Sequence, residues 1–110
     1  MRLPHSKRAI VDLRKLEDYC LNTGHARGRH KARIFRQRLG IDRNDAEWLR
    51  TMLLEGIRNN EATELSGNIW GTNWRVDMPV ARHGANAVVR SIWIIRFGEE
   101  APRFVTCWVL

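Results

Sequence analysis

The sequence has few cysteines, and their positions exclude several kinds of site. It contains two cysteines in 110 residues, Cys20 and Cys107, and no Cys-x-x-Cys pair. Cysteine and histidine nowhere show the spacing of a zinc site. Both cysteines lie among apolar residues, so we expect buried, reduced thiols. We therefore expect no metal ion and no cofactor.

Long apolar segments are also missing. There is no run of roughly 18 apolar residues, and the initial MRLPHSKRAI lacks the apolar core of a signal peptide. We therefore expect a cytoplasmic protein without a membrane span. A chain of 110 residues can bury a core without disulfides or metals, and we expect one domain over residues 1–110.

The third absence is that of carboxylates between Asp18 and Asp42. Within this interval HARGRHKARIFRQR, residues 25–38, holds six cations and two histidines. The net charge of +7 arises in the N-terminal half, since from residue 59 onward five arginines balance five acids. Like charges repel unless an anion offsets them, and a phosphate backbone is the commonest such anion. We expect an RNA partner; the alternative is a solvated basic surface.

Helical periodicity covers most of the N-terminal half. Apolar residues at helical spacing predict helices over residues 9–21, 30–39 and 45–58. Gly40 is the expected C-terminal stop of the second helix. Asn44 with Glu47 three residues later resembles a capping box at the start of the third.

Alternation of apolar and polar residues replaces the helical period in the C-terminal half. It predicts strands over residues 62–70, 74–80, 87–97 and 103–110. The expected turns are residues 71–73, 82–86 and 98–102. The third strand is apolar on both faces and is expected to be central. The prediction is an α+β domain, with two or three N-terminal helices packed on one face of an antiparallel, roughly four-stranded meander sheet.

Four tryptophans fall in the predicted sheet: Trp70, Trp74, Trp93 and Trp108. Exposed aromatic residues on a sheet would form an RNA-stacking platform. Such residues are more often part of the core, and we expect at least two of the four to be buried.

The segment GRHKARIFRQRLGI, residues 28–41, resembles a bacterial and phage-associated family filed as a domain of unknown function. Its members combine this block with a preceding helix similar to LRKLEDYCLN, residues 13–22. They end in segments similar to VVRSIWII and PRFVT, residues 88–95 and 102–106. The resemblance covers nearly the whole chain and implies a fold but no established activity.

The order of helices and strands is also similar to that of small ribonuclease toxins of the barnase, colicin D and RelE type. In that group, catalytic His, Lys or Arg residues come from the helical part and nearby strands, often completed by Ser or Thr on a late strand. His30 and Lys31 match the first set, and Thr106 matches the second. The sequence departs from the barnase pattern because no general-base glutamate lies near the basic segment.

Metal-independent RNA cleavage needs a base for the 2′-hydroxyl, an acid for the leaving 5′-oxygen and a cation for the phosphorane. His30 is the predicted proton carrier, because histidine titrates near neutral pH. Lys31 is the predicted catalytic cation, and Thr106 is an auxiliary. His25, in a glycine-flanked loop, is a candidate second proton carrier. The alternative is that these are surface residues without a role.

The candidate nucleic-acid contacts are Arg27, Arg29, Arg33, Arg36 and Arg103. Gly28 would let the backbone approach a phosphate, although the segment is not a G-x-x-x-x-G-K loop. In a regular strand Arg103 and Thr106 point to opposite faces, whereas Thr106 and Trp108 share one.

These patterns favour a metal-independent ribonuclease, the toxin of a toxin–antitoxin or other conflict system, with an acidic antitoxin as partner. A second hypothesis is a non-catalytic module that binds nucleic acid or an acidic protein. Steeply salt-dependent binding without product would indicate it. A third is an immunity protein or structural subunit that dimerises through an exposed sheet edge.

Overall fold

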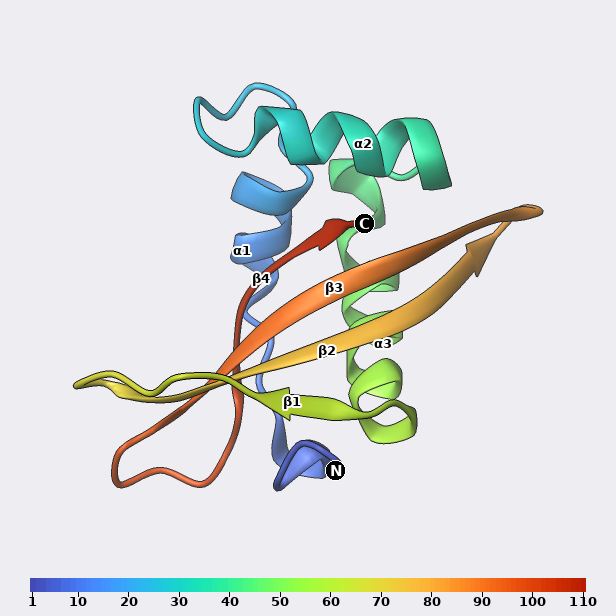
Figure 1. Cartoon of the computed structure of the whole chain (residues 1–110). Coiled ribbons are helices and arrows are strands. Elements are labelled where there is room, and N and C mark those ends of the chain that lie inside the picture. Colours follow the sequence, from blue (N-terminus) through green and yellow to red (C-terminus); the bar gives the residue numbers. More distant parts are fainter.

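The computed structural model describes residues 1–110 and places the helices before the strands (Figure 1). Its helical segments are η1 (Ser6–Arg8), α1 (Leu13–Lys15), η2 (Leu16–Cys20), α2 (Arg29–Leu39), η3 (Arg43–Asp45) and α3 (Ala46–Asn59). Its strands are β1 (Ala62–Glu64), β2 (Gly71–Arg82), β3 (Ala85–Arg96) and β4 (Arg103–Val109). This order confirms the predicted α+β fold.

The four strands form the predicted antiparallel meander, in the order β1-β2-β3-β4. His83 and Gly84 connect β2 and β3, both with positive φ, as a tight two-residue hairpin requires. β1 is shorter than predicted, and the turn expected at residues 71–73 lies earlier. The reason is Asn68, whose side chain accepts hydrogen bonds from the backbone N–H groups of Trp70 and Gly71.

The first helix begins later than predicted, at Leu13 rather than residue 9. The Asp12 side chain caps it by accepting a hydrogen bond from the Arg14 backbone, at 3.0 Å. Ile10 pairs instead with the segment at the start of β4. Its N–H donates to the Pro102 carbonyl, and its carbonyl accepts from Phe104, both at 2.9 Å. A long-range contact therefore overrides the local helical period.

After Lys15 the helix widens into the π-helical segment η2. Its closing bond runs from the Leu21 N–H to the Leu16 carbonyl, at 2.9 Å. Segments of this kind are rare and occur frequently at functional sites.

Gly40 ends α2 in the left-handed conformation, with φ 65°, as predicted. The capping box before α3 differs from the expected Asn44 and Glu47. Asp42 accepts a hydrogen bond from the Asn44 N–H, and the Asp45 carboxylate accepts one from the Asp42 N–H, both at 2.9 Å. The start signal thus belongs to η3, which continues directly into α3.

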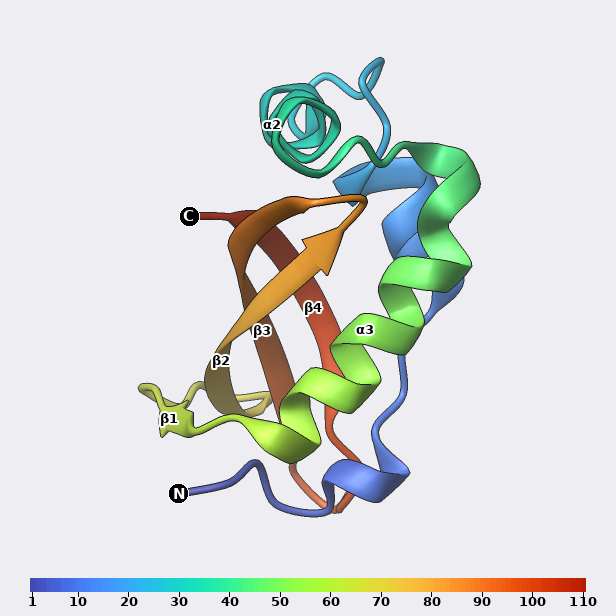
Figure 2. The same cartoon turned by 90° about the vertical axis from the view of Figure 1, so that its right-hand side faces the viewer.

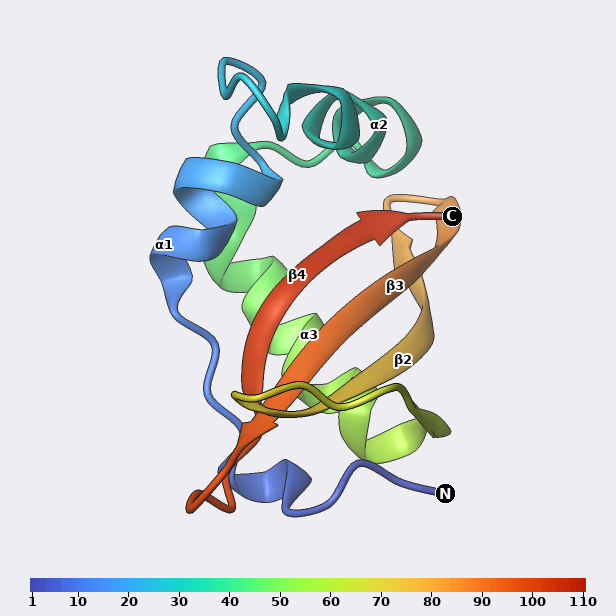
Figure 3. The same ribbon diagram turned by 60° about the vertical axis from the view of Figure 1, so that its left-hand side comes forward.

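The core lies between α3 and one face of the sheet, and no helix covers the opposite face (Figure 2). Trp74 and Trp93 are buried, as expected for at least two tryptophans, and so are Cys20 and Cys107. α2 lies across one end of the sheet, while α1 runs beside β4 (Figure 3). No helix is both long and apolar enough to cross a membrane.

Candidate functional site

A bulge in β4 decides which side chains share a face of the sheet. Ile92 of β3 pairs with Thr106, but the adjacent Trp93 pairs with Phe104, so Val105 is an extra residue. Thr106 therefore lies on the same face as Arg103, because their partners are two residues apart in β3. The expectation for a regular strand was wrong here. Bulges occur often beside active sites, where they re-aim a side chain.

Val105 and Thr106 line a cavity of about 360 Å³ with three residues from the helical half: Lys15, Tyr19 and Lys31. We call it the β4-edge pocket. Lys15 comes from α1, Tyr19 from η2 and Lys31 from α2; in Figure 3, α1 lies beside β4 and α2 lies beyond the end of the strand. The lining supplies two ammonium groups, a phenol and a hydroxyl, and no carboxylate. It is therefore suited to an anion.

Both lysines are held in place by neutral groups. The Lys15 ammonium donates a hydrogen bond to the Phe104 carbonyl at 2.8 Å. The Lys31 nitrogen lies 4.3 Å from the centre of the Trp108 ring, within range of a cation–π contact. Neither lysine forms an ion pair with a carboxylate. Their charges are therefore available to a ligand.

Two buried thiols lie behind the Thr106 hydroxyl. The Cys20 sulfur is 3.8 Å from Thr106 Oγ1. Hydrogen bonding from Cys107 lowers the pKa of Cys20 to about 7, and Thr106 and the Lys31 charge act in the same direction. Burial raises the pKa of Cys107. Because Cys20 is only 1% exposed, it can position the Thr106 hydroxyl but cannot itself meet a substrate.

His25 lies next to Tyr19 of the β4-edge pocket. The two rings meet edge to face, with centres 4.7 Å apart. His25 Nδ1 accepts hydrogen bonds from the backbone N–H groups of Arg27 and Gly28, both at 3.0 Å. A neutral ring with this pattern carries its proton on Nε2. The side chain therefore organises the loop before α2 and supports Tyr19.

His30 lies apart from the two other predicted catalytic residues. It is exposed in the first turn of α2, where its side chain has no hydrogen-bond partner in the protein. Successive helical residues diverge by about 100°, so His30 and the neighbouring Lys31 face different directions. The structure brings Lys31 and Thr106 to one pocket and leaves His30 outside it.

The arginines predicted to bind nucleic acid fall into three groups. Arg29, Arg33 and Arg36 share the flank of α2 opposite Lys31, because their spacing of four and three residues keeps them together. They form no ion pair, and neither does Arg27 before the helix. Arg103 differs, since Glu99 accepts a hydrogen bond from its guanidinium at 2.9 Å. Of the five arginines predicted to bind nucleic acid, Arg103 alone has an acidic partner.

Gly28 has a structural role that the sequence did not show. It is buried against η2, and an added Cβ would lie 2.7 Å from the Tyr19 carbonyl oxygen. Its lack of a side chain lets α2 begin directly beside Tyr19, rather than opening the backbone to a phosphate as expected.

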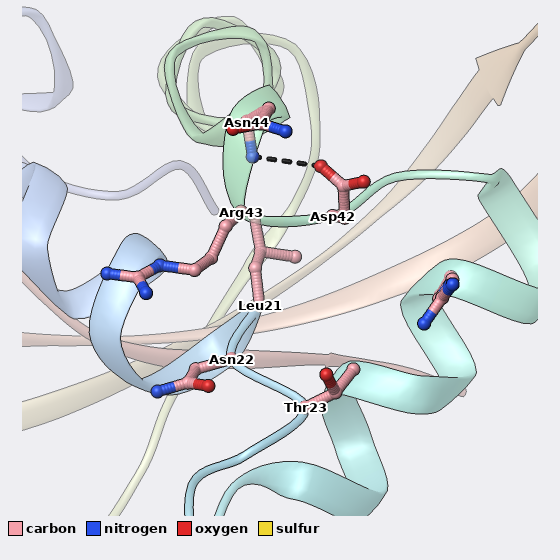
Figure 4. Close-up of a pocket in the computed structure, with 7 residues that line it drawn as sticks. Leu21, Asn22, Thr23, Asp42, Arg43 and Asn44 are labelled. Carbon is pink, nitrogen blue, oxygen red and sulfur yellow. Dashed lines mark hydrogen bonds between the residues drawn. The ribbon is translucent and has the colours of Figure 1, made fainter.

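A second pocket lies on the other flank of α2, between η2 and η3 (Figure 4). Its polar groups are mostly engaged within the protein. The Asp42 carboxylate accepts the Asn44 N–H, and Arg43 donates to Asp18 at 3.0 Å. We interpret it as a structural junction. Nowhere in the chain do three or more His, Cys, Asp or Glu side chains form a group that could hold a metal ion.

The chain matches a described protein family and is similar in fold to a solved structure. Residues 2–110 match a family described as a domain of unknown function, DUF6883. A chain of the contact-dependent growth inhibition toxin–immunity protein complex from Klebsiella pneumoniae 342 has a TM-score of 0.70 and 18% sequence identity. The match covers 93% of this chain and 100% of that chain, and it shows a shared fold. None of the curated proteins compared matches the sequence.

Proposed function

The chain belongs to the DUF6883 family of domains of unknown function, and we propose that it is an RNA-cleaving toxin of a bacterial conflict system. The observation that carries the proposal is the β4-edge pocket. It combines two lysines without ionic partners, a threonine hydroxyl and a tyrosine phenol around a space of about 360 Å³. These are groups that bind a phosphate and stabilise added negative charge.

Lys15 and Lys31 bind the phosphate of the bond that is cut. The phosphorane formed by attack of the 2′-oxygen carries more negative charge than the starting phosphate, so two fixed cations favour it. Thr106 donates a hydrogen bond to a non-bridging oxygen, with its hydroxyl positioned by Cys20. The products are a cyclic phosphate and a free 5′-hydroxyl.

Tyr19 is the residue that we assign to proton donation to the leaving 5′-oxygen. Its ring lines the pocket and is held edge-on by His25. The 2′-hydroxyl loses its proton to water as the cyclic phosphate forms. This assignment replaces His30, which lies outside the pocket, as the proton carrier.

The fold comparison supports a role in conflict, because the matching chain belongs to a complex of a toxin and an immunity protein. By analogy we propose an acidic protein as the neutralising partner. Its carboxylates would pair with the free arginines of α2, Arg29, Arg33 and Arg36.

The test is incubation of the purified protein, in EDTA, with an RNA pool that includes transfer RNA. We expect discrete fragments with cyclic phosphate and 5′-hydroxyl ends. Salt-dependent binding of intact RNA without any fragments would instead support a non-catalytic binding module.

A further inference from the structure

A further cavity, of about 510 Å³, lies beside the β4-edge pocket. It is lined by Lys15, Trp70, Ile94, Arg96 and Val105. Lys15 and Val105 line both cavities, so the two are adjacent at the bulge of β4. We call this further cavity the Trp70 pocket.

Trp70 leaves 69% of its surface exposed, although it is the largest apolar side chain in this wall. The turn made by Asn68 and a hydrogen bond from the Phe97 N–H to the Trp70 carbonyl, at 3.1 Å, fix its backbone. A large, exposed aromatic ring on a fixed backbone is typical of a recognition surface.

The charged groups around this ring favour one kind of occupant. Lys15 and Arg96 are the charged residues of the lining, and neither forms an ion pair. A nucleotide offers both a flat ring for Trp70 and a phosphate for the two cations. A volume of several hundred Å³ is also that of a small-ligand site.

We infer that the Trp70 pocket binds a nucleobase of single-stranded RNA, next to the phosphate held in the β4-edge pocket. Lys15 contacts the phosphate shared by the two nucleotides, and Arg96 contacts the next one. Single-stranded RNA is the substrate class, because an unpaired base turns out to stack on the indole without the cost of breaking a base pair. The inference rests on the proposed function.

The test is binding of a labelled single-stranded 2′-O-methyl oligonucleotide, followed by fluorescence anisotropy. This probe lacks the attacking hydroxyl, so the result does not depend on cleavage. One abasic nucleotide is placed at successive positions. At one of these positions, we expect the missing base to weaken binding to the wild-type protein roughly 5- to 100-fold.

Trp70→Ala is expected to weaken binding of the intact oligonucleotide as much as the abasic nucleotide weakens binding to the wild type. In this variant, removing the base at that position should cause no further loss of affinity. Trp70→Phe keeps a ring and restores most of the affinity. Phe97→Ala is the matched control, because Phe97 is 70% exposed but does not line the pocket, and it should bind like the wild type.

Equal binding by Trp70→Ala and wild type, or an abasic penalty that persists in Trp70→Ala, would overturn the inference and favour a protein as the occupant. Absence of wild-type binding would overturn it as well. Cleavage in the RNA-pool assay decides the proposed function separately in each case.

Discussion

At the scale of single residues, the lysines of the β4-edge pocket lack acidic partners, whereas several arginines of the sheet have them. Arg90 binds Asp77 through two hydrogen bonds, at 2.8 and 2.9 Å, and Arg103 binds Glu99. Lys15 and Lys31 have no such partners. Acidic side chains thus neutralise Arg90 and Arg103 on the sheet, whereas no acid neutralises the two lysines. The free positive charge therefore lies in the pocket where we propose that RNA binds.

Tyr19→Phe removes the phenol hydroxyl and keeps the ring against His25. We expect RNA cleavage to slow by about 10²–10⁴-fold with the fold unchanged, because the leaving oxygen loses its proton donor. His30→Ala is expected to cleave at the wild-type rate. Single-turnover rates on one RNA, with circular dichroism of each variant, measure this. The reverse pattern would restore His30 as the proton carrier.

Asp77→Asn tests the ion pair on the helix-free face of the sheet. The Arg90 guanidinium lowers the pKa of Asp77 below its usual value. The pair therefore contributes stability above the unfolded-state pKa, near 3.9, and loses it as pH falls through the lower folded-state pKa. We expect the variant to lose about 1 kcal/mol of unfolding free energy at pH 7.

The difference in unfolding free energy between wild type and Asp77→Asn, measured with denaturant at pH 7 and in acid, should shrink as the pH falls through the lowered folded-state pKa of Asp77. Glu55→Gln, at an exposed residue without an ion pair, serves as the control and should change little at either pH. A difference at Asp77 that is as large in acid as at pH 7 would contradict the account.

At the scale of elements, the site depends on how closely α2 approaches η2. Gly28 has φ −94° and ψ −12°, a conformation open to any residue. Only the nearby Tyr19 carbonyl excludes a side chain there. The same contact places Lys31 and Tyr19 at one pocket. Packing of the two elements therefore determines the geometry of the site.

Gly28→Ala should lower the unfolding free energy by about 1–3 kcal/mol, because α2 must move away from the Tyr19 carbonyl. The rate of RNA cleavage should fall by more than the loss of folded protein explains, because Lys31 moves with α2. Gly24→Ala is the control, because its Cβ would meet only the side-chain oxygen of Asn22, at 3.3 Å, and no backbone atom. Equal stability of the two variants, measured by chemical denaturation, would contradict this role of Gly28.

Periodicity predicted α2, α3, β2 and β3 to within a few residues, because each follows its own local pattern over many residues. It was wrong at Ile10, which joins the segment before β4 instead of a helix. That contact is long-range, and local pattern contains no information about it. It was also wrong at β1, which the local turn of Asn68 shortens, because alternation of apolar and polar residues does not report turn chemistry.

At the scale of the whole molecule, the site forms where the helical half meets the last strand. Residue type alone indicated Lys31 and Thr106, which the fold brings to one pocket. Lys15 and Tyr19 gave no such signal, since their role depends on the distant β4. His30 lies outside this pocket, and its role as proton carrier stays a prediction. The chemistry of the site was thus predictable in part, but its composition required tertiary structure.

The positive charge of α2 is divided between two flanks of the helix. Lys31 faces the β4-edge pocket, and Arg29, Arg33 and Arg36 face away from it. Variants on the two flanks can therefore separate a specific role of the pocket from a general effect of positive charge.

The most direct measurement compares RNA cleavage by Lys31→Met and Arg36→Met, each of which removes one positive charge. Our account predicts that Lys31→Met cuts RNA at least about 100-fold more slowly than wild type, because the phosphorane loses a fixed cation. Arg36→Met should keep most of the activity and show only weaker binding at higher salt. Equal rates for the two variants would contradict the assignment of the β4-edge pocket as the site of cleavage.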